Sequence, residues 1–338
     1  MTIQRAEVNW AVVGTGFVSQ CIAEDLRLTS GARRYAVCSR SAERAQLFAA
    51  ERGFTRAYAS FRTMLSDPSV EAVYIATPHA THAALAIAAL EAGKHVLIEK
   101  PMALDAAEAR RIRDVATARR RFAMEAMWMR FNPVYRELVG SARAGTIGEI
   151  RSVRASFGLP FGSALSGQWT AQRGSSTLLD QGVYPVTFAL DLLGRPTRIR
   201  AGGRVREDGV DLTEHITFEY DGGRFAQLSA SMIEYIEPTA SVSGTDGWMT
   251  IPAPFWAATE FEIHAGGIAR ALGESNRIRF ERQGNGYVPM LEAATDAILD
   301  GQTGHALHSL SDTITTLSLI DAIRGAVNTT PAIEEETR

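Results

Sequence analysis

The chain has 338 residues, of which 46% are hydrophobic and 22% are charged, and its formal net charge at pH 7 is -3. This composition is ordinary for a globular protein, the length suits two domains, and the charge provides no basic field for nucleic acid or an anionic membrane. No apolar run reaches the ~18 residues that span a bilayer, and residues 1–9 show no charged-then-apolar leader. The two cysteines, Cys21 and Cys38, fit neither a disulfide framework nor a zinc motif. We therefore expect a cytoplasmic protein.

Short apolar runs alternate with helical stretches in the N-terminal part of the chain. The predicted strands are Val8–Val13, Tyr35–Cys38, Ala72–Ala76, His95–Ile98 and Phe122–Glu125. The predicted helices are Phe17–Leu28, Ser41–Glu51, Ala80–Ala92 and Asp105–Arg120. This alternation predicts an α/β domain of the Rossmann type, with a doubly wound parallel sheet.

A glycine turn follows the first predicted strand. Gly14 permits a tight bend, and Gly16 lets backbone amides approach a pyrophosphate. The helix that begins near Phe17 offers unpaired N–H groups and its positive end, while Ser19 replaces the usual third glycine. This pattern predicts a dinucleotide-binding turn; the alternative is a tight turn without a ligand.

The end of the second predicted strand lacks the acid that usually accepts hydrogen bonds from the ribose of NAD. Ser39 and Arg40 stand there, with Arg44 one turn later. A hydroxyl and a guanidinium suit a 2′-phosphate, so we expect NADP as the cofactor in preference to NAD. The alternative is that Arg40 is only a solvated side chain.

The fourth predicted strand runs into Glu99-Lys100-Pro101. Ligands of such sheets bind beyond the carboxyl ends of the strands, which predicts Lys100 near the nicotinamide. A peptide bond before proline is also one that can be cis.

The pattern changes from about Ile150 onward. Alternating polar and apolar residues predict strands such as Ile216–Tyr220, and Asp221–Gly223 predicts a hairpin turn. Two helices, Met290–Leu299 and Ser311–Val327, end the chain. We expect an α+β domain with a mostly antiparallel open sheet, and place a dinucleotide-binding domain at 1–128 and a substrate-binding and oligomerisation domain at 129–338.

Several motifs resemble those of the glucose-fructose oxidoreductase/inositol dehydrogenase (Gfo/Idh/MocA) family. They are Val13–Gly16, Thr77-Pro78-His79 with His82, and Ala92–Pro101. The segments Glu125–Pro133, Leu178–Pro185 and Thr239–Thr245 are similar to the dimeric dihydrodiol dehydrogenase and NADP-dependent D-xylose dehydrogenase branch. The resemblance implies a homodimer or higher homo-oligomer assembled through the open sheet.

The resemblance also implies roles for three residues. Tyr184 would transfer the proton, Lys100 would orient the reacting oxygen, and Asp180 would position substrate hydroxyls or tune the pair. Positions four apart on a helix share a face, so both Asp180 and Tyr184 can point into one cleft. The alternatives are a packed aromatic at Tyr184 and a structural cap or ion pair at Asp180.

Further candidates surround this set. Thr77, Pro78, His79, His82 and Glu99 are assigned to the cofactor cleft. A metal is not expected, because His79 and His82 have no third ligand near them in the sequence. Trp128 and Phe157 form either an apolar wall for the substrate or ordinary core. The loop 163–177 has Gly174-Ser175-Ser176-Thr177 where the family usually has a glycine run, which leaves its cofactor contacts open.

These observations predict an NADP-dependent dehydrogenase that moves a hydride between nicotinamide and a hydroxyl or carbonyl carbon. The expected substrate is a sugar, a cyclic polyol or a trans-dihydrodiol. Two alternatives are a reductase of a keto or anhydro sugar and a redox sensor that binds NADP without turnover. A sensor needs no proton relay, so Lys100, Asp180 and Tyr184 argue against it.

Overall fold

The computed structural model describes residues 7–160 and 169–329, which divide into two compact units. Unit 1 comprises residues 1–136, 172–174 and 280–315, and unit 2 comprises 137–171, 175–279 and 316–338. The later part of the chain thus contributes a segment to unit 1. The assignment of a function to each side of residue 128 stays a prediction.

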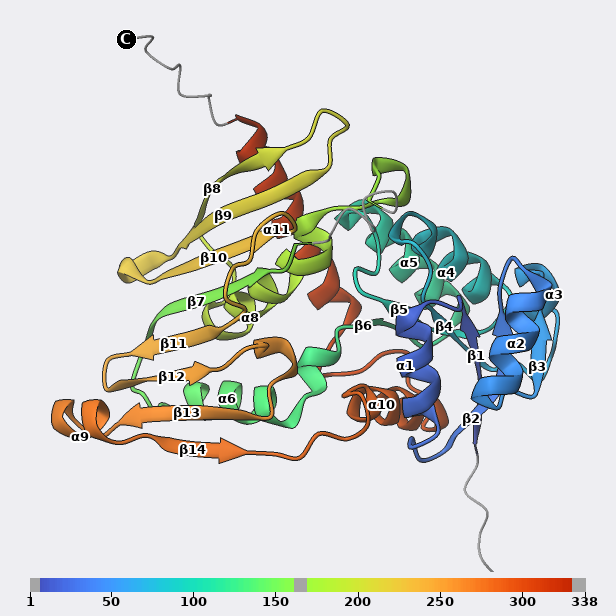
Figure 1. Cartoon of the computed structure of the whole chain (residues 1–338), viewed down its shortest axis with the longest axis horizontal. Coiled ribbons are helices and arrows are strands. Elements are labelled where there is room, and N and C mark those ends of the chain that lie inside the picture. The colour runs from blue at the N-terminus through green and yellow to red at the C-terminus, as the bar shows by residue number, and fades with distance from the viewer. Residues whose placement is uncertain (1–6, 161–168, 330–338) are drawn as a thin grey trace, which may run out of the picture. The chain divides into compact units, whose positions relative to one another are not determined.

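Unit 1 is built around a six-stranded parallel sheet with the order β3-β2-β1-β4-β5-β6 (Figure 1). Its strands are β1 Val8–Val13, β2 Ala32–Cys38, β3 Arg56–Tyr58, β4 Ala72–Ile75, β5 His95–Glu99 and β6 Ala123–Ala126. The order reverses between β1 and β4, which is the arrangement of a doubly wound nucleotide-binding sheet. The predicted Rossmann fold is therefore confirmed.

Helices connect these strands. They are α1 Phe17–Leu26, α2 Ala42–Arg52, α3 Phe61–Leu65, α4 His82–Glu91, α5 Ala106–Arg119 and, from the later segment, α10 Val288–Leu299. The hydroxyl of Ser41 caps α2 by accepting the Arg44 N–H, as the sequence predicts. Trp10 of β1 is fully buried and donates its indole N–H to the Thr295 hydroxyl of α10 at 3.2 Å. This contact ties α10 to the core of unit 1.

Unit 2 contains an eight-stranded sheet with the order β14-β13-β12-β11-β7-β10-β9-β8. All neighbours are antiparallel except β7 and β10. The strands are β7 Ile150–Gly158, β8 Arg198–Val205, β9 Asp211–Glu219, β10 Phe225–Ser231, β11 Ala240–Gly244, β12 Gly247–Ile251, β13 Glu260–Ala265 and β14 Asn276–Arg279. The expected mostly antiparallel sheet is confirmed.

The helices described for this part of the chain are α6 Pro133–Arg143, α8 Val183–Leu193, α9 Ile268–Gly273 and α11 Leu310–Thr329. A π-helical turn, Leu178–Gly182, runs directly into α8. Helix α8 packs behind β7 and β10 (Figure 1) and is buried along most of its length. Within the described ranges, no helix is long and apolar enough to cross a membrane.

Candidate functional site

The glycine turn joins β1 to α1 with little room at its first position. Gly14 has a φ of +111°, and a Cβ there would lie 2.2 Å from the carbonyl oxygen of Ala76. Gly16 is exposed, and a Cβ at that position would meet no atom within 4 Å. Phe17 is 78% exposed, so its ring is not core. The turn therefore presents open backbone at the helix start, which fits a pyrophosphate.

Four predicted cofactor segments follow the carboxyl ends of neighbouring parallel strands. Gly14 follows β1, Ser39 follows β2, Thr77 follows β4, and Lys100 follows β5. Because parallel strands end at the same edge, the sheet brings these segments together along the edge where doubly wound folds bind nucleotides.

The end of β2 presents two exposed arginines. Neither the Arg40 nor the Arg44 guanidinium has a hydrogen bond or ion pair to another residue within 7–160 and 169–329. The Ser39 hydroxyl is half-buried and accepts the Ser41 N–H at 3.4 Å. This edge therefore offers one hydroxyl and two cations without a carboxylate partner.

His82 is fully buried between two backbone segments of the site. Its Nδ1 lies 2.8 Å from the Pro101 carbonyl oxygen, and its Nε2 lies 2.8 Å from that of Thr77. Burial and then the nearby Lys100 charge lower the pKa of the imidazole, against the two carbonyl contacts. His82 thus acts on the site by linking the segments after β4 and β5. Direct contact with a cofactor stays a prediction.

His79 is half-buried, and its Nδ1 lies 3.3 Å from the carbonyl oxygen of Gly174. A Cβ at Gly174, where φ is +72°, would lie 2.4 Å from a methyl carbon of Leu104. Residues 172–174 therefore pack closely on unit 1, whereas 161–168 of the same loop lie outside the described residues. No cluster of three or more metal-ligating side chains occurs in the described part of the chain.

The backbone around Lys100 is fixed from two sides. The Lys100–Pro101 peptide bond is cis. The Lys100 N–H donates to Oε2 of Glu99 at 3.1 Å, while Oε1 of Glu99 accepts from the Tyr74 hydroxyl. The Met102 N–H donates to a carboxylate oxygen on β6, at 2.9 Å. Glu99 therefore supports the lysine backbone and is itself buried.

The β6 carboxylate belongs to Glu125, which lies at the centre of a buried hydrogen-bond network. Its Oε2 lies 2.9 Å from Nε2 of His308 and accepts from the Thr313 hydroxyl at 3.0 Å, while Nδ1 of His308 contacts the Arg130 guanidinium at 2.8 Å. Burial raises the pKa of Glu125, but the hydrogen bonds from His308, Met102 and Thr313 outweigh it and lower the pKa. Sequence reasoning gave this network no role, because its members are distant in the chain.

In unit 2, the π-helical turn and the first turn of α8 carry Asp180 and Tyr184. Asp180 is half-buried and Tyr184 is 4% exposed. The ring of Phe157 lies 5.8 Å from that of Tyr184 and stacks on Trp256 at 3.6 Å, with a 9° angle between planes. Trp256, which the sequence reasoning missed, is half-buried and lies 5.6 Å from Tyr184. The predicted proton donor thus sits in an aromatic cluster.

The other aromatic candidate is part of unit 1. Trp128 is 8% exposed and packs on Tyr287 with ring centroids 4.8 Å apart. A Cβ at Gly286, where φ is +104°, would lie 2.9 Å from the indole ring. Lys100 also belongs to unit 1, and Asp180 and Tyr184 to unit 2. Their meeting in one catalytic cleft stays a prediction.

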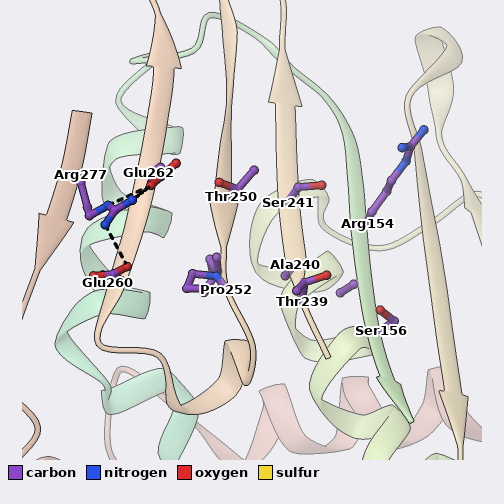
Figure 2. A pocket seen from close by; sticks show the side chains of 12 residues that line it. Arg154, Ser156, Thr239, Ala240, Ser241, Thr250, Pro252, Glu260, Glu262 and Arg277 are labelled. Carbon is purple, nitrogen blue, oxygen red and sulfur yellow. Dashed lines mark hydrogen bonds and ion pairs between the residues drawn. The ribbon is translucent and has the colours of Figure 1, made fainter. Parts of the chain in front are cut away.

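The face of the unit 2 sheet opposite α8 is polar and hollowed. Figure 2 shows side chains from β7, β11, β12 and β13 pointing to this face, among them Ser241 and Thr250. Arg277 pairs with Glu260 and Glu262 at one side of the hollow. Arg154 lies at the other side and has no ion pair within the described residues.

Comparison with known proteins agrees with the two-domain fold. The family model described as an oxidoreductase family with an NAD-binding Rossmann fold matches residues 8–126, and that of the GFO/IDH/MocA C-terminal domain matches 135–250. Trans-1,2-dihydrobenzene-1,2-diol dehydrogenase of Bos taurus is 36% identical over 260 residues, covering 76% of this chain and 77% of that protein. This chain belongs to the Gfo/Idh/MocA oxidoreductase family.

Two more proteins are similar to this chain. The Homo sapiens protein of the same name is also 36% identical, over 76% of this chain and 78% of its own length. The solved structure of KijD10, a 3-ketoreductase from Actinomadura kijaniata in complex with NADP and TDP-benzene, is 26% identical with a TM-score of 0.83. That similarity covers 95% of this chain and 98% of KijD10. The sequence-based resemblance to the family is confirmed.

Proposed function

We propose that this Gfo/Idh/MocA enzyme is an NADP-dependent dehydrogenase of a small cyclic substrate with a CH–OH group. The observation that carries the proposal is the edge of the parallel sheet, where the glycine turn follows β1, the Ser39 segment follows β2 and the Lys100 segment follows β5. The bound nicotinamide supplies the hydride acceptor or donor.

Selection of NADP is proposed for the Ser39 hydroxyl and the Arg40 and Arg44 guanidinium groups. A 2′-phosphate carries negative charge and oxygen acceptors, which match two exposed cations without partners among the described residues. The relative KijD10 is described in complex with NADP, which supports the same cofactor here. Equal or better use of NAD in a comparison of kcat/KM would reject the preference.

Proton transfer is proposed for the Tyr184 hydroxyl. In oxidation, the substrate hydroxyl gives its proton to the Tyr184 oxygen while its carbon loses the hydride; in reduction both move in reverse. The Lys100 ammonium would orient the reacting oxygen and stabilise the ionised phenol, and Asp180 would hold neighbouring substrate hydroxyls. Hydrogen bonds hold the Lys100 backbone within unit 1, and the aromatic cluster packs around Tyr184 within unit 2, so each group is held in place in its own unit.

The proposed substrate class is a trans-dihydrodiol, a cyclic polyol or an aldopyranose. Flat aromatic faces such as Trp256 and Phe157 pack well on the apolar face of a ring, and the similar Bos taurus protein is named a dihydrodiol dehydrogenase. A second candidate is reduction of a keto sugar, which the similarity to a 3-ketoreductase favours. A panel of sugars, inositols and dihydrodiols, followed at the reduced-nicotinamide absorbance with NADP, separates these classes. Tight NADPH binding without turnover would favour the sensor instead.

A homodimer is proposed to cover the polar face of the unit 2 sheet. Small side chains such as Ser241 and Thr250 keep the hollow in Figure 2 open. In a two-fold interface each contact occurs twice, so Arg154 of one copy can face Glu260 and Glu262 of the other. Sedimentation of Arg154→Glu should show weaker association than the wild type. A wild-type monomer at micromolar concentration would reject the proposal.

A further inference from the structure

Asp211, at the start of β9, holds the beginning of the helical segment that carries the proposed proton donor. Its Oδ2 accepts the Leu178 N–H at 2.7 Å and the Ser176 hydroxyl at 2.9 Å. The Ser176 oxygen in turn accepts the Leu179 N–H at 3.1 Å. Because the first N–H groups of a helix lack partners within it, Asp211 and Ser176 together satisfy two of them. A carboxylate is also favoured at this positive end of the helix.

A β-bulge explains why Asp211 faces the helix. The register between β8 and β9 shifts between Arg204 and Val205, which leaves Leu212 as the extra residue on β9. An extra residue reverses the alternation of side chains across a strand. Asp211 therefore lies on the same buried face as Glu214, three positions later.

Glu214 is a second carboxyl group in this buried place. It is 0% exposed, and neither of its oxygens has a hydrogen-bond partner within the described ranges. Burial and then the charge of Asp211 raise the pKa of Glu214 to about 10, while Arg324 of α11 opposes this. Gly203 and Ala230, its neighbours on β8 and β10, add no charge. Glu214 is thus a buried acid beside Asp211, and its raised pKa favours the protonated form at pH 7.

We propose that Asp211 and Glu214 form a buried acid pair that positions the segment bearing Asp180 and Tyr184. Asp211 holds the first turn directly by accepting the Leu178 N–H, and indirectly by accepting the Ser176 hydroxyl, whose oxygen accepts the Leu179 N–H. Neither residue touches the reacting atoms in this account, so both are positioning residues. The inference rests on the proposed role of Tyr184.

The kinetic test compares Asp211→Ala with Asp211→Asn. Loss of the carboxylate in Asp211→Ala frees the first turn, and kcat should fall about tenfold or more, because small displacements of a proton donor are costly. The Kd for NADP, measured by cofactor fluorescence, should change less than about twofold, since the cofactor edge is in unit 1. Asp211→Asn keeps an oxygen that accepts the Leu178 N–H and should restore most of kcat.

The matched control is Glu219→Gln at the far end of β9, where the acid pairs with Arg200 at the surface. Its kcat should stay near that of the wild type. Normal kcat in Asp211→Ala, or a parallel loss of kcat and NADP affinity, would overturn the positioning role. So would failure of Asp211→Asn to recover activity.

The melting temperature, measured across a range of pH, tests whether Glu214 is protonated in the folded protein. Glu214 is protonated in the fold but ionised in the unfolded chain above about pH 4.3, so the wild type loses stability as pH rises from there toward 10. Glu214→Gln needs no proton, and its Tm should exceed that of the wild type by a margin that grows from pH 5 to pH 9. If Glu214 is instead ionised and paired with Arg324, the variant melts lower than the wild type, and the pair as proposed is wrong.

The proposed catalysis by Tyr184 and the proposed positioning by Asp211 are rejected by different experiments. Normal kcat in Tyr184→Phe rejects the proposed catalysis, while the Tm of Glu214→Gln still reports on the pair. A large loss of kcat in Tyr184→Phe together with normal kcat in Asp211→Ala rejects only the positioning.

Discussion

Nδ1 of the buried His82 ring lies 2.8 Å from the carbonyl oxygen of Pro101, the residue directly after Lys100. The same ring reaches the Thr77 carbonyl with its other nitrogen. One side chain thus connects the ends of two neighbouring parallel strands that carry proposed site residues. The position of the Lys100 backbone depends on a residue that need not touch substrate or cofactor.

Replacing His82 with Ala should loosen this link. A neutral imidazole donates one N–H, so one backbone carbonyl oxygen loses its donor. A buried acceptor left without a donor costs about 1–3 kcal/mol, and we therefore expect a lower Tm. We also expect kcat to fall about tenfold, because the lysine loses its fixed position. His215→Ala, at an exposed position of β9, is the control. Unchanged Tm and kcat in His82→Ala would contradict the linking role.

Glu125 should make the fold sensitive to acid. Its hydrogen bonds hold its pKa below the usual range, so the stability that it contributes is present above about pH 4.3 and is lost as pH falls through the lowered pKa. Glu125→Gln should be less stable by about 1–3 kcal/mol at pH 7, because the amide has one acceptor oxygen where the buried carboxylate accepts from Met102, His308 and Thr313. Its unfolding free energy, from urea titrations at pH 3–7, should also vary less with acid pH. An equal dependence of the unfolding free energy on pH in Glu125→Gln and the wild type would refute this prediction.

Substitutions of Ser39 and Arg40, which follow β2, should change the preference between NADP and NAD. Ser39→Asp brings a carboxylate that repels a 2′-phosphate, and Arg40→Ala removes a cation; each should lower kcat/KM for NADP about tenfold relative to NAD. Arg33→Ala, also exposed on β2 but at the opposite end, is the control. A ratio that stays at the wild-type value in both variants would mean that NADP is not selected here.

Trp256 should contribute to the binding of ring substrates. Trp256→Ala removes one of the two stacked aromatic rings beside Tyr184, so KM for a dihydrodiol should rise about tenfold, with a smaller change in kcat. Steady-state kinetics on a dihydrodiol and on a linear polyol separate the effect of ring contact from a general loss of structure. An equal rise of KM for both substrates would argue against ring stacking.

Much of unit 1 could be predicted from the sequence, because most of its strands are short apolar runs and glycine or proline lies close to the ends of β1, β4 and β5. Strand β3, Arg56–Tyr58, is only three residues long and partly exposed, so no periodicity marks it. The position of Lys100 at the end of β5 follows directly from the strand pattern. In unit 2, alternation identified the β9–β10 hairpin but not β13 or β14.

The buried contacts that hold the proposed site residues in place could not be predicted from the sequence. Glu125 and His308 are 183 positions apart, and no spacing rule joins them. Asp211 reaches the helix only because of the bulge at Leu212, and a bulge leaves no clear mark in the alternation of so short a strand. Such contacts depend on tertiary packing, whereas the motifs that they support are local.

The central claim is that the Tyr184 hydroxyl transfers the proton with help from the Lys100 ammonium. Tyr184→Phe removes only that hydroxyl, and its single-turnover rate with NADP and the best substrate of the panel tests the claim most directly. We expect the rate to fall by roughly 10² or more while the Kd for NADP holds, and Lys100→Met to behave likewise. A near-normal rate in Tyr184→Phe would contradict the account.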